Sequence, residues 1–273
     1  MTTTVRCASG AIVALALSAC MVSTGEEMDT TGLSEDEAIS SVQQALVTPT
    51  FTGRWASTNS VTCPSSYNKV MGTGARNISG GGDLVRGAYP FTNETVNAMA
   101  AIGDTTEIST YAICTNAAGI STVWNYDSDG SATASCGSEK IAVGGGGLCQ
   151  SDGARLYRTR PTPDTNGSVP TGWTASCNTG GAHAYARCVD PNSWYDFTSC
   201  RTKRTDAVAV RADAVCPSGK IAAAAGGYCG GGSDIWTVGS GSGAALSSTV
   251  VWCDETHVSV HAYAICCDAA ATN

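Results

Sequence analysis

The chain has 273 residues, of which 42% are hydrophobic and 14% charged, a length sufficient for one large domain or several small ones. Its formal net charge is −8, and residues 20–50 alone hold six acidic residues and no basic one. Residues 51–273 carry 14 basic and 17 acidic residues, so this body lacks the net basic surface that nucleic-acid binding requires, and we expect no nucleic-acid partner.

The first 20 residues have the pattern of an export signal. Arg6 precedes a mostly apolar run that ends at Ala19 and is too short to span a membrane. A cut after Ala19 would place Leu17 where an ordinary signal peptidase needs a small residue. The sequence Leu-Ser-Ala-Cys instead resembles the lipobox of bacterial lipoproteins, which implies a signal peptide at 1–19 and a lipid on Cys20. The resemblance predicts an exported protein, anchored through this lipid to the outer membrane or cell surface.

Residues 20–50 are expected to form an acidic tether followed by a short helix. The stretch up to residue 32 is polar, which is typical of a flexible spacer. Ser34 and Glu37 then match a capping box, and Pro49 follows the last apolar positions of the helical pattern. Two roles remain open for this helix, a spacer that docks on the body and an element that binds a partner.

From residue 51 the sequence is rich in glycine and in short alternating runs, and it repeats. CPSSYNKV, CGSEKIAV and CPSGKIAA begin at Cys63, Cys136 and Cys216, and STYAIC, AHAYARC and VHAYAIC end at Cys114, Cys188 and Cys266. We therefore expect an all-β protein with three disulfide-stapled repeats of about 75 residues, spanning 51–115, 116–189 and 190–273. The repeats could form separate small β modules or one body with pseudo-threefold symmetry.

Twelve cysteines lie between residues 63 and 267, and an even number in an exported protein predicts disulfides. The opening and closing cysteines of each repeat form three pairs, and the second and third repeats each contain an inner pair. The last two cysteines are then left for each other. The predicted bonds are Cys63–Cys114, Cys136–Cys188, Cys149–Cys177, Cys216–Cys266, Cys229–Cys253 and Cys200–Cys267. No C-x2-C pair is present, so zinc is the weaker interpretation, and we expect neither a metal nor a cofactor.

The closing segment of each repeat predicts a strand with two different faces. In the second repeat, small residues point to one face and His183, Tyr185 and Arg187 to the other. The matching residues are His261, Tyr263 and Ile265 in the third repeat and Ser109, Tyr111 and Ile113 in the first. This second face is either an exposed ligand site or another packed layer.

The tryptophans offer further candidates for ligand contacts. Trp173 and Trp252 lie near the inner cysteines and are either sugar-stacking residues or core residues. Trp55, Trp124 and Trp194 lie near the openings of the repeats, and we expect them in the core.

Motifs of enzymatic chemistry are missing from the sequence. Neither G-x-S-x-G nor H-E-x-x-H occurs, and the glycine runs lack the lysine of a phosphate-binding loop, so we expect a protein that is not an enzyme. The opening and closing motifs resemble cysteine-bounded modules of exported bacterial surface proteins and are similar to the distal domains of type IV pilus tip adhesins. This resemblance covers residues 63–267 and implies surface recognition.

The leading hypothesis is a surface-anchored lipoprotein whose β body binds glycans or mediates adhesion. One alternative is a structural envelope protein without a small ligand. The other is an exported hydrolase with an unrecognised site.

Overall fold

The computed structural model describes residues 51–58, 60–77, 84–100, 108–191, 197–240, 246–255 and 258–268. The predicted signal peptide, Cys20 and the predicted helix lie outside these residues. The described part of the chain is all-β, with 18 strands and one short 3-10 helix, η1 (Ser65–Tyr67).

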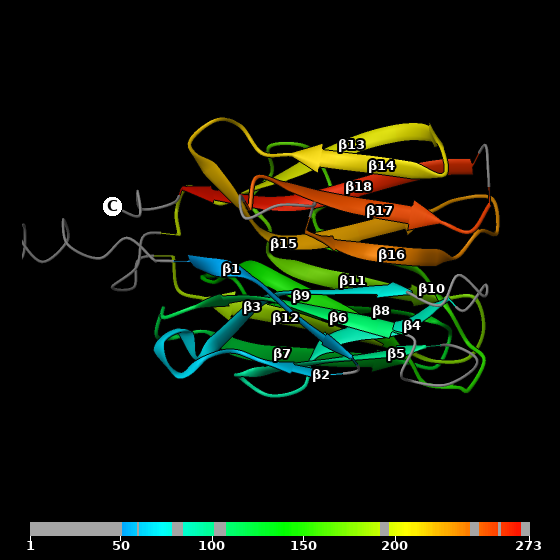
Figure 1. Cartoon of the computed structure of the whole chain (residues 1–273), viewed down its shortest axis with the longest axis horizontal. Helices are drawn as coiled ribbons and strands as arrows, with labels where there is room; N and C mark the ends of the chain where they lie inside the picture. The colour runs from blue at the N-terminus through cyan, green and yellow to red at the C-terminus, as the bar shows by residue number, and fades with distance from the viewer. Residues whose placement is uncertain are drawn as a thin grey trace, which may run out of the picture. The chain divides into compact units, whose positions relative to one another are not determined.

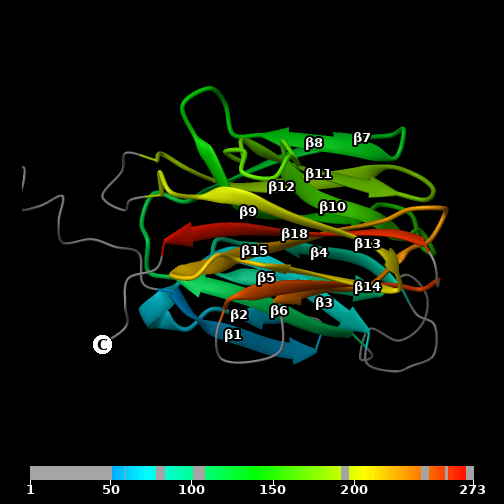
Figure 2. The same cartoon turned by 90° about the horizontal axis from the view of Figure 1, so that it is seen from above.

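The strands form three antiparallel sheets of six strands each, here named sheets A, B and C (Figures 1 and 2). Sheet A has the order β1 (Phe51–Thr58), β6 (Ile108–Thr115), β3 (Lys69–Asn77), β16 (Ile235–Ser240), β17 (Ser248–Cys253), β14 (Arg211–Val215). Sheet B has the order β2 (Ser60–Thr62), β5 (Thr95–Ala100), β4 (Val85–Pro90), β9 (Ile141–Cys149), β12 (Ala182–Val189), β7 (Ser121–Asp127). Sheet C has the order β13 (Arg201–Ala209), β18 (Val258–Asp268), β15 (Lys220–Cys229), β10 (Leu156–Thr162), β11 (Gly172–Cys177), β8 (Ser131–Ser135).

All three sheets follow one strand order, and each combines strands from two distant stretches of the chain. In sheet B, β7, β12 and β9 lie together, and β9 pairs with β4, which lies some fifty residues earlier in the chain. In sheet C, β15 pairs with β10 in the same way. In sheet A the corresponding pair is β3 with β16. Because every sheet needs strands from two stretches, the described strands do not form three separate small modules.

Strands β3, β9 and β15 contact one another, and their glycines permit this approach. Each of the three strands carries a bulge, at Met71, Val143 and Ala223. The residue after each bulge is small, because the neighbouring backbone is close. A Cβ atom at Gly144 would overlap the carbonyl oxygen of Met71. These glycines therefore serve close packing of the backbone.

The inner faces of the sheets share one hydrophobic core of mostly small residues. The alanine face of β12 is completely buried, and the glycines opposite it in β9 leave space for the large ring of Trp173 from β11. A Cβ atom at Gly147 would lie 2.5 Å from the Cβ atom of Ala175, also in β11. Small residues on sheet B thus let sheet C pack against it at short distance.

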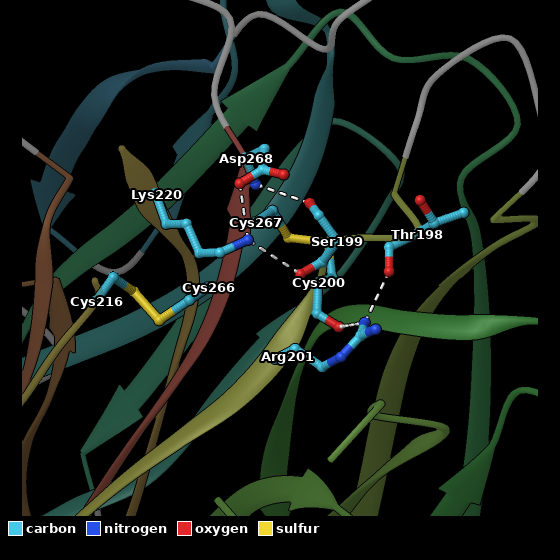
Figure 3. Close-up of a disulfide and its surroundings, with 9 residues drawn as sticks. All are labelled: Thr198, Ser199, Cys200, Arg201, Cys216, Lys220, Cys266, Cys267 and Asp268. Atoms are coloured by element: carbon cyan, nitrogen blue, oxygen red, sulfur yellow. Dashed lines mark hydrogen bonds and ion pairs between the residues drawn. A yellow bond between two sulfur atoms is a disulfide. The ribbon is translucent and has the colours of Figure 1, made fainter. Parts of the chain in front are cut away.

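Six disulfides staple the described strands, in the same six pairs that the repeated motifs predict. Cys266 and Cys267 are neighbours in β18, and because successive strand residues point to opposite faces they bond different partners, Cys216 and Cys200 (Figure 3). Lys220 forms an ion pair of 2.7 Å with Asp268 beside them. Each disulfide typically contributes about 2 to 4 kcal/mol to stability. Six of them indicate an oxidising, exported environment.

Candidate functional site

An open groove of about 660 Å³ lies on the face of sheet B opposite the buried alanines. One wall comes from β12 and its neighbour β7, and the other comes from the end of β4 and the turn into β5. The lining residues are Tyr89, Pro90, Phe91, Thr92, Asn93, Thr122, Trp124, His183 and Tyr185. Its volume falls in the range of about 300 to 1,000 Å³ that is usual for small-ligand sites.

The strand register brings the groove's side chains onto one face. Tyr185 of β12 pairs with Trp124 of β7, and cross-strand partners point to the same side of a sheet. On its other flank Tyr185 pairs with Gly146 of β9. A Cβ atom at Gly146 would overlap the carbonyl oxygen of Ala88 and lie 2.8 Å from the Cα atom of Tyr89, so glycine lets the backbone of β4 approach β9 here.

Aromatic rings form a continuous row along the groove. Tyr89 stacks on Tyr185 with 5.0 Å between ring centroids and 21° between ring planes. The His183 ring lies 6.3 Å from that of Tyr185 and 6.1 Å from that of Trp124. Trp124 is 62% exposed, and Phe91 at the rim is 63% exposed. Large apolar side chains gathered at an exposed concave site are typical of a binding surface.

Arg187, a predicted ligand contact, is not among the residues that line this groove. Its side chain is completely buried beneath the groove. Its Nε donates to the carbonyl oxygen of Val70 (2.7 Å), and its Nη1 donates to Oδ1 of Asn93 (2.9 Å) and to the hydroxyl of Thr122. Burial lowers the pKa of Arg187 to about 10, so the guanidinium stays protonated at neutral pH. Arg187 therefore fixes two polar groups of the lining, Asn93 and Thr122.

The groove is uncharged at neutral pH. Burial lowers the pKa of His183 below its ordinary value of 6.5, which favours the neutral imidazole. Burial, assisted by the neighbouring Tyr89, raises the pKa of Tyr185 to about 12, so its phenol keeps its proton. The other lining side chains are apolar, hydroxyl or amide groups. The site therefore suits a ligand without net charge.

The two tryptophan candidates lie elsewhere. Trp173 is 1% exposed, and its indole nitrogen donates to the hydroxyl of Thr159 (2.8 Å), so the prediction that it could stack on a sugar is wrong. Trp252 is half-buried on sheet A, with its ring 5.7 Å from that of Trp236. It belongs to a different surface from the groove.

The structure also adds residues that the sequence analysis missed. We expected Trp124 in the core, and it is instead the most prominent ring of the groove. Its position beside Tyr185 follows from the pairing of β7 with β12, which the side-chain pattern of either strand alone does not reveal. Tyr89 and Asn93 come from a stretch almost one hundred residues before β12, and no local pattern links them to it.

No protein-family model matches this chain, and no curated protein matches it either. Within the described residues, no group of three His, Cys, Asp or Glu side chains is placed to hold a metal ion. The same part of the chain contains no helix that is long and apolar enough to cross a membrane.

Proposed function

We propose that this chain is a surface-anchored lipoprotein whose β body binds neutral glycans in the groove of sheet B. The observation that carries the proposal is the row formed by Tyr89, Tyr185, His183 and Trp124 in an uncharged groove. A pyranose ring has an apolar face of C–H groups, which packs against aromatic rings.

The polar groups of the groove complete the recognition. Sugar hydroxyls both donate and accept hydrogen bonds, and so do the amide of Asn93 and the hydroxyls of Thr92 and Thr122. Arg187 holds Asn93 and Thr122 in place before any ligand arrives. A site that is ordered in advance loses less conformational entropy on binding.

The anchoring and the arrangement of the body belong to the same proposal. Cys20 would carry the lipid, and residues 20–50 would hold the body away from the membrane, in keeping with the lipobox-like sequence. Mass spectrometry of the mature N-terminal peptide tests this, and an unmodified N-terminus at another residue would refute it. The common strand order of the three sheets supports three repeats in one pseudo-threefold body.

The test of glycan binding uses the purified full-length protein in detergent on an array of neutral oligosaccharides, followed by titration of the best binder. Trp124→Ala should reduce affinity at least tenfold because the ligand loses its main stacking surface. The melting temperature should stay nearly constant, since Trp124 is largely exposed.

Trp252→Ala is the matched control, because it removes the same side chain from sheet A. We expect it to leave glycan affinity unchanged. An equal loss of affinity in both variants would refute the groove as the site. A wild-type protein that binds no neutral glycan at millimolar concentration would favour a structural role in the envelope.

A further inference from the structure

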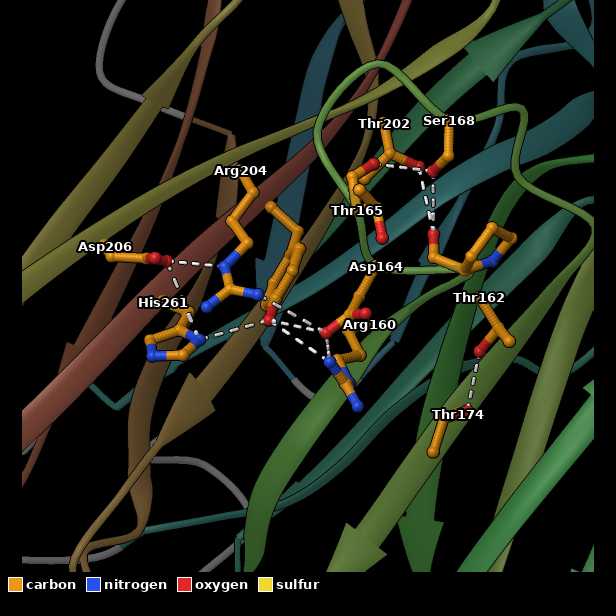
Figure 4. A network of polar contacts seen from close by, with 12 residues as sticks. Arg160, Thr162, Asp164, Thr165, Ser168, Thr174, Thr202, Arg204, Asp206 and His261 are labelled. Atoms are coloured by element: carbon orange, nitrogen blue, oxygen red, sulfur yellow. Dashed lines mark hydrogen bonds and ion pairs between the residues drawn. The ribbon is translucent and has the colours of Figure 1, made fainter.

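A second pocket, of about 210 Å³, lies on sheet C at the place that the groove occupies on sheet B. Strands β10, β15 and β18 hold the same positions in their sheet as β4, β9 and β12 hold in sheet B. The lining residues are Arg158, Arg160, Asp164, Arg204, Tyr228 and His261. Figure 4 shows Arg204, Asp206 and His261 gathered on one side of this network and Arg160 and Asp164 on the other.

The pocket contains more positive than negative charge. Arg160 forms an ion pair with Asp164, and Arg204 lies 2.6 Å from a carboxylate oxygen of Asp206. Each of these two pairs joins one positive and one negative charge, so each pair is neutral. Arg158 has no carboxylate within ion-pair distance among the described residues, so one guanidinium is left in excess.

Arg158 is held at the pocket by aromatic rings. Its guanidinium carbon lies 5.4 Å from the ring centroid of Tyr157 and 5.8 Å from that of Tyr228. Its Nη2 donates to the hydroxyl of Tyr157 (3.1 Å), and its Nε is buried without a hydrogen-bond partner in the described part of the chain. These cation–π contacts hold the guanidinium of Arg158 in place beside the pocket.

Hydrogen bonds connect the groups at the base of the pocket. The buried Tyr263 accepts a hydrogen bond from Nη1 of Arg160 (3.4 Å), donates one to Asp164 (3.4 Å) and lies 3.3 Å from Nδ1 of His261. Nε2 of His261 lies 2.8 Å from the hydroxyl of Ser259. Such second-layer contacts fix the groups that line a site before a ligand binds.

We propose that this pocket binds a single oxyanion group, the carboxylate or sulfate of an acidic saccharide, with Arg158 as its principal partner. A planar guanidinium recognises carboxylate and sulfate oxygens through paired N–H donors. The volume suits one such group better than a whole oligosaccharide. This site is separate from the groove of sheet B, and the proposal does not depend on glycan binding there.

The test titrates the purified full-length protein with inorganic sulfate, with glucuronate and with glucose, and measures each association constant by calorimetry at low ionic strength. We expect sulfate, glucuronate or both to bind, and glucose not to bind at this pocket. Binding of only one anion identifies which group the pocket takes. Arg158→Gln should weaken anion binding at least tenfold, and Arg158→Lys should retain part of the affinity because it keeps the charge.

Arg211→Gln is the matched control, because it removes the same charge from sheet A, where Arg211 pairs with Asp213 at 2.8 Å. It should change anion affinity less than twofold. Equal losses in Arg158→Gln and Arg211→Gln would show a general effect of net charge and overturn the proposal. So would a wild-type protein that binds neither anion, whatever the neutral glycan array shows.

Discussion

The groove of sheet B and the pocket of sheet C occupy the same place in two sheets of identical strand order, yet their chemistry differs. A tyrosine of the closing strand holds the same position in both sheets, and it lines the groove of sheet B but lies beneath the pocket of sheet C. In sheet B it is Tyr185, and Tyr89 stacks on it. In sheet C it is Tyr263, and the corresponding neighbour is Arg160, whose guanidinium carbon lies 5.9 Å from the ring centroid. On the other flank, Arg204 pairs with Tyr263 as Trp124 pairs with Tyr185. Exchanges of aromatic for cationic side chains at equivalent positions thus separate an uncharged site from a charged one.

The buried residues beneath the two sites also differ in charge. Arg187 lies under the groove, and the matching residue in β18 is the apolar Ile265. The buried cation therefore lies below the uncharged site, where it positions Asn93, while the arginines of sheet C line the pocket itself. A common backbone can thus hold different ligands, because only side chains at a few equivalent positions change.

The largest effect should come from removing the buried support of the groove. Arg187→Ala leaves the carbonyl of Val70 and the amide of Asn93 without their partner, so we expect a loss of about 3 to 5 kcal/mol in the free energy of unfolding. Arg187→Lys should recover only part of it, because an ammonium cannot reproduce the forked donor geometry. Denaturant unfolding measures both variants.

Ile265→Val provides the control at the equivalent position of sheet C. It deletes one buried methylene and should cost only about 0.5 to 1.5 kcal/mol. If Arg187→Ala cost no more than Ile265→Val, the buried guanidinium would not support the groove.

Much of this fold could be predicted from the sequence, because its signals are local. Glycine-rich alternating runs indicate strands, and the evenly spaced motifs around Cys136 and Cys216 imply which cysteines pair. The partners of β4 and β10 could not be predicted in this way. They pair with β9 and β15 of the following stretch, and nothing in a strand's own pattern of side chains specifies a partner so far along the chain.

The candidate site was predictable only in part, for the same reason. Alternation in β12 predicts that His183 and Tyr185 share a face, and the structure places both in the groove. The same alternation assigns Arg187 to that face, but the turn after β4 covers it and makes it a buried support. Trp124 was expected in the core because tryptophan is usually buried, and its place in the edge strand β7 exposes it.

A smaller effect on stability should distinguish Tyr263 from Tyr185, its equivalent in sheet B. The hydroxyl of Tyr263 contacts Arg160, Asp164 and His261, so Tyr263→Phe should lower the free energy of unfolding by about 1 to 2 kcal/mol and weaken sulfate binding. The hydroxyl of Tyr185 has no hydrogen-bond partner among the described residues, so Tyr185→Phe should change stability by less than about 0.5 kcal/mol. Thermal unfolding of the two variants gives the comparison. Equal effects would mean that the hydroxyl network of sheet C adds no stability.

The smallest effect should appear in the pH dependence of the two sites. Burial lowers the pKa of both His183 and His261 below the ordinary value of 6.5, so the unfolded chain binds more protons as the pH falls through that value. Stability should therefore decrease on acidification from about pH 7 to about pH 5, by a modest amount because both rings are partly exposed. The charged groups around His261 are Arg158, Arg160, Asp164, Arg204 and Asp206.

The pH dependence of ligand binding should differ between the sites of His261 and His183. Burial, Arg204 and Arg160 oppose the protonation of His261, and Asp206 favours it. A bound sulfate, which stays ionised over this range, would raise the lowered pKa of His261. Sulfate affinity should then rise a few-fold on acidification, whereas neutral glycan affinity should fall as His183 gains a charge in an apolar groove. His261→Gln should flatten only the pH dependence of sulfate affinity, and His183→Gln only that of neutral glycan affinity. If the affinities of both ligands changed in the same way with pH, the charge difference between the two sites would not govern which ligand each site binds.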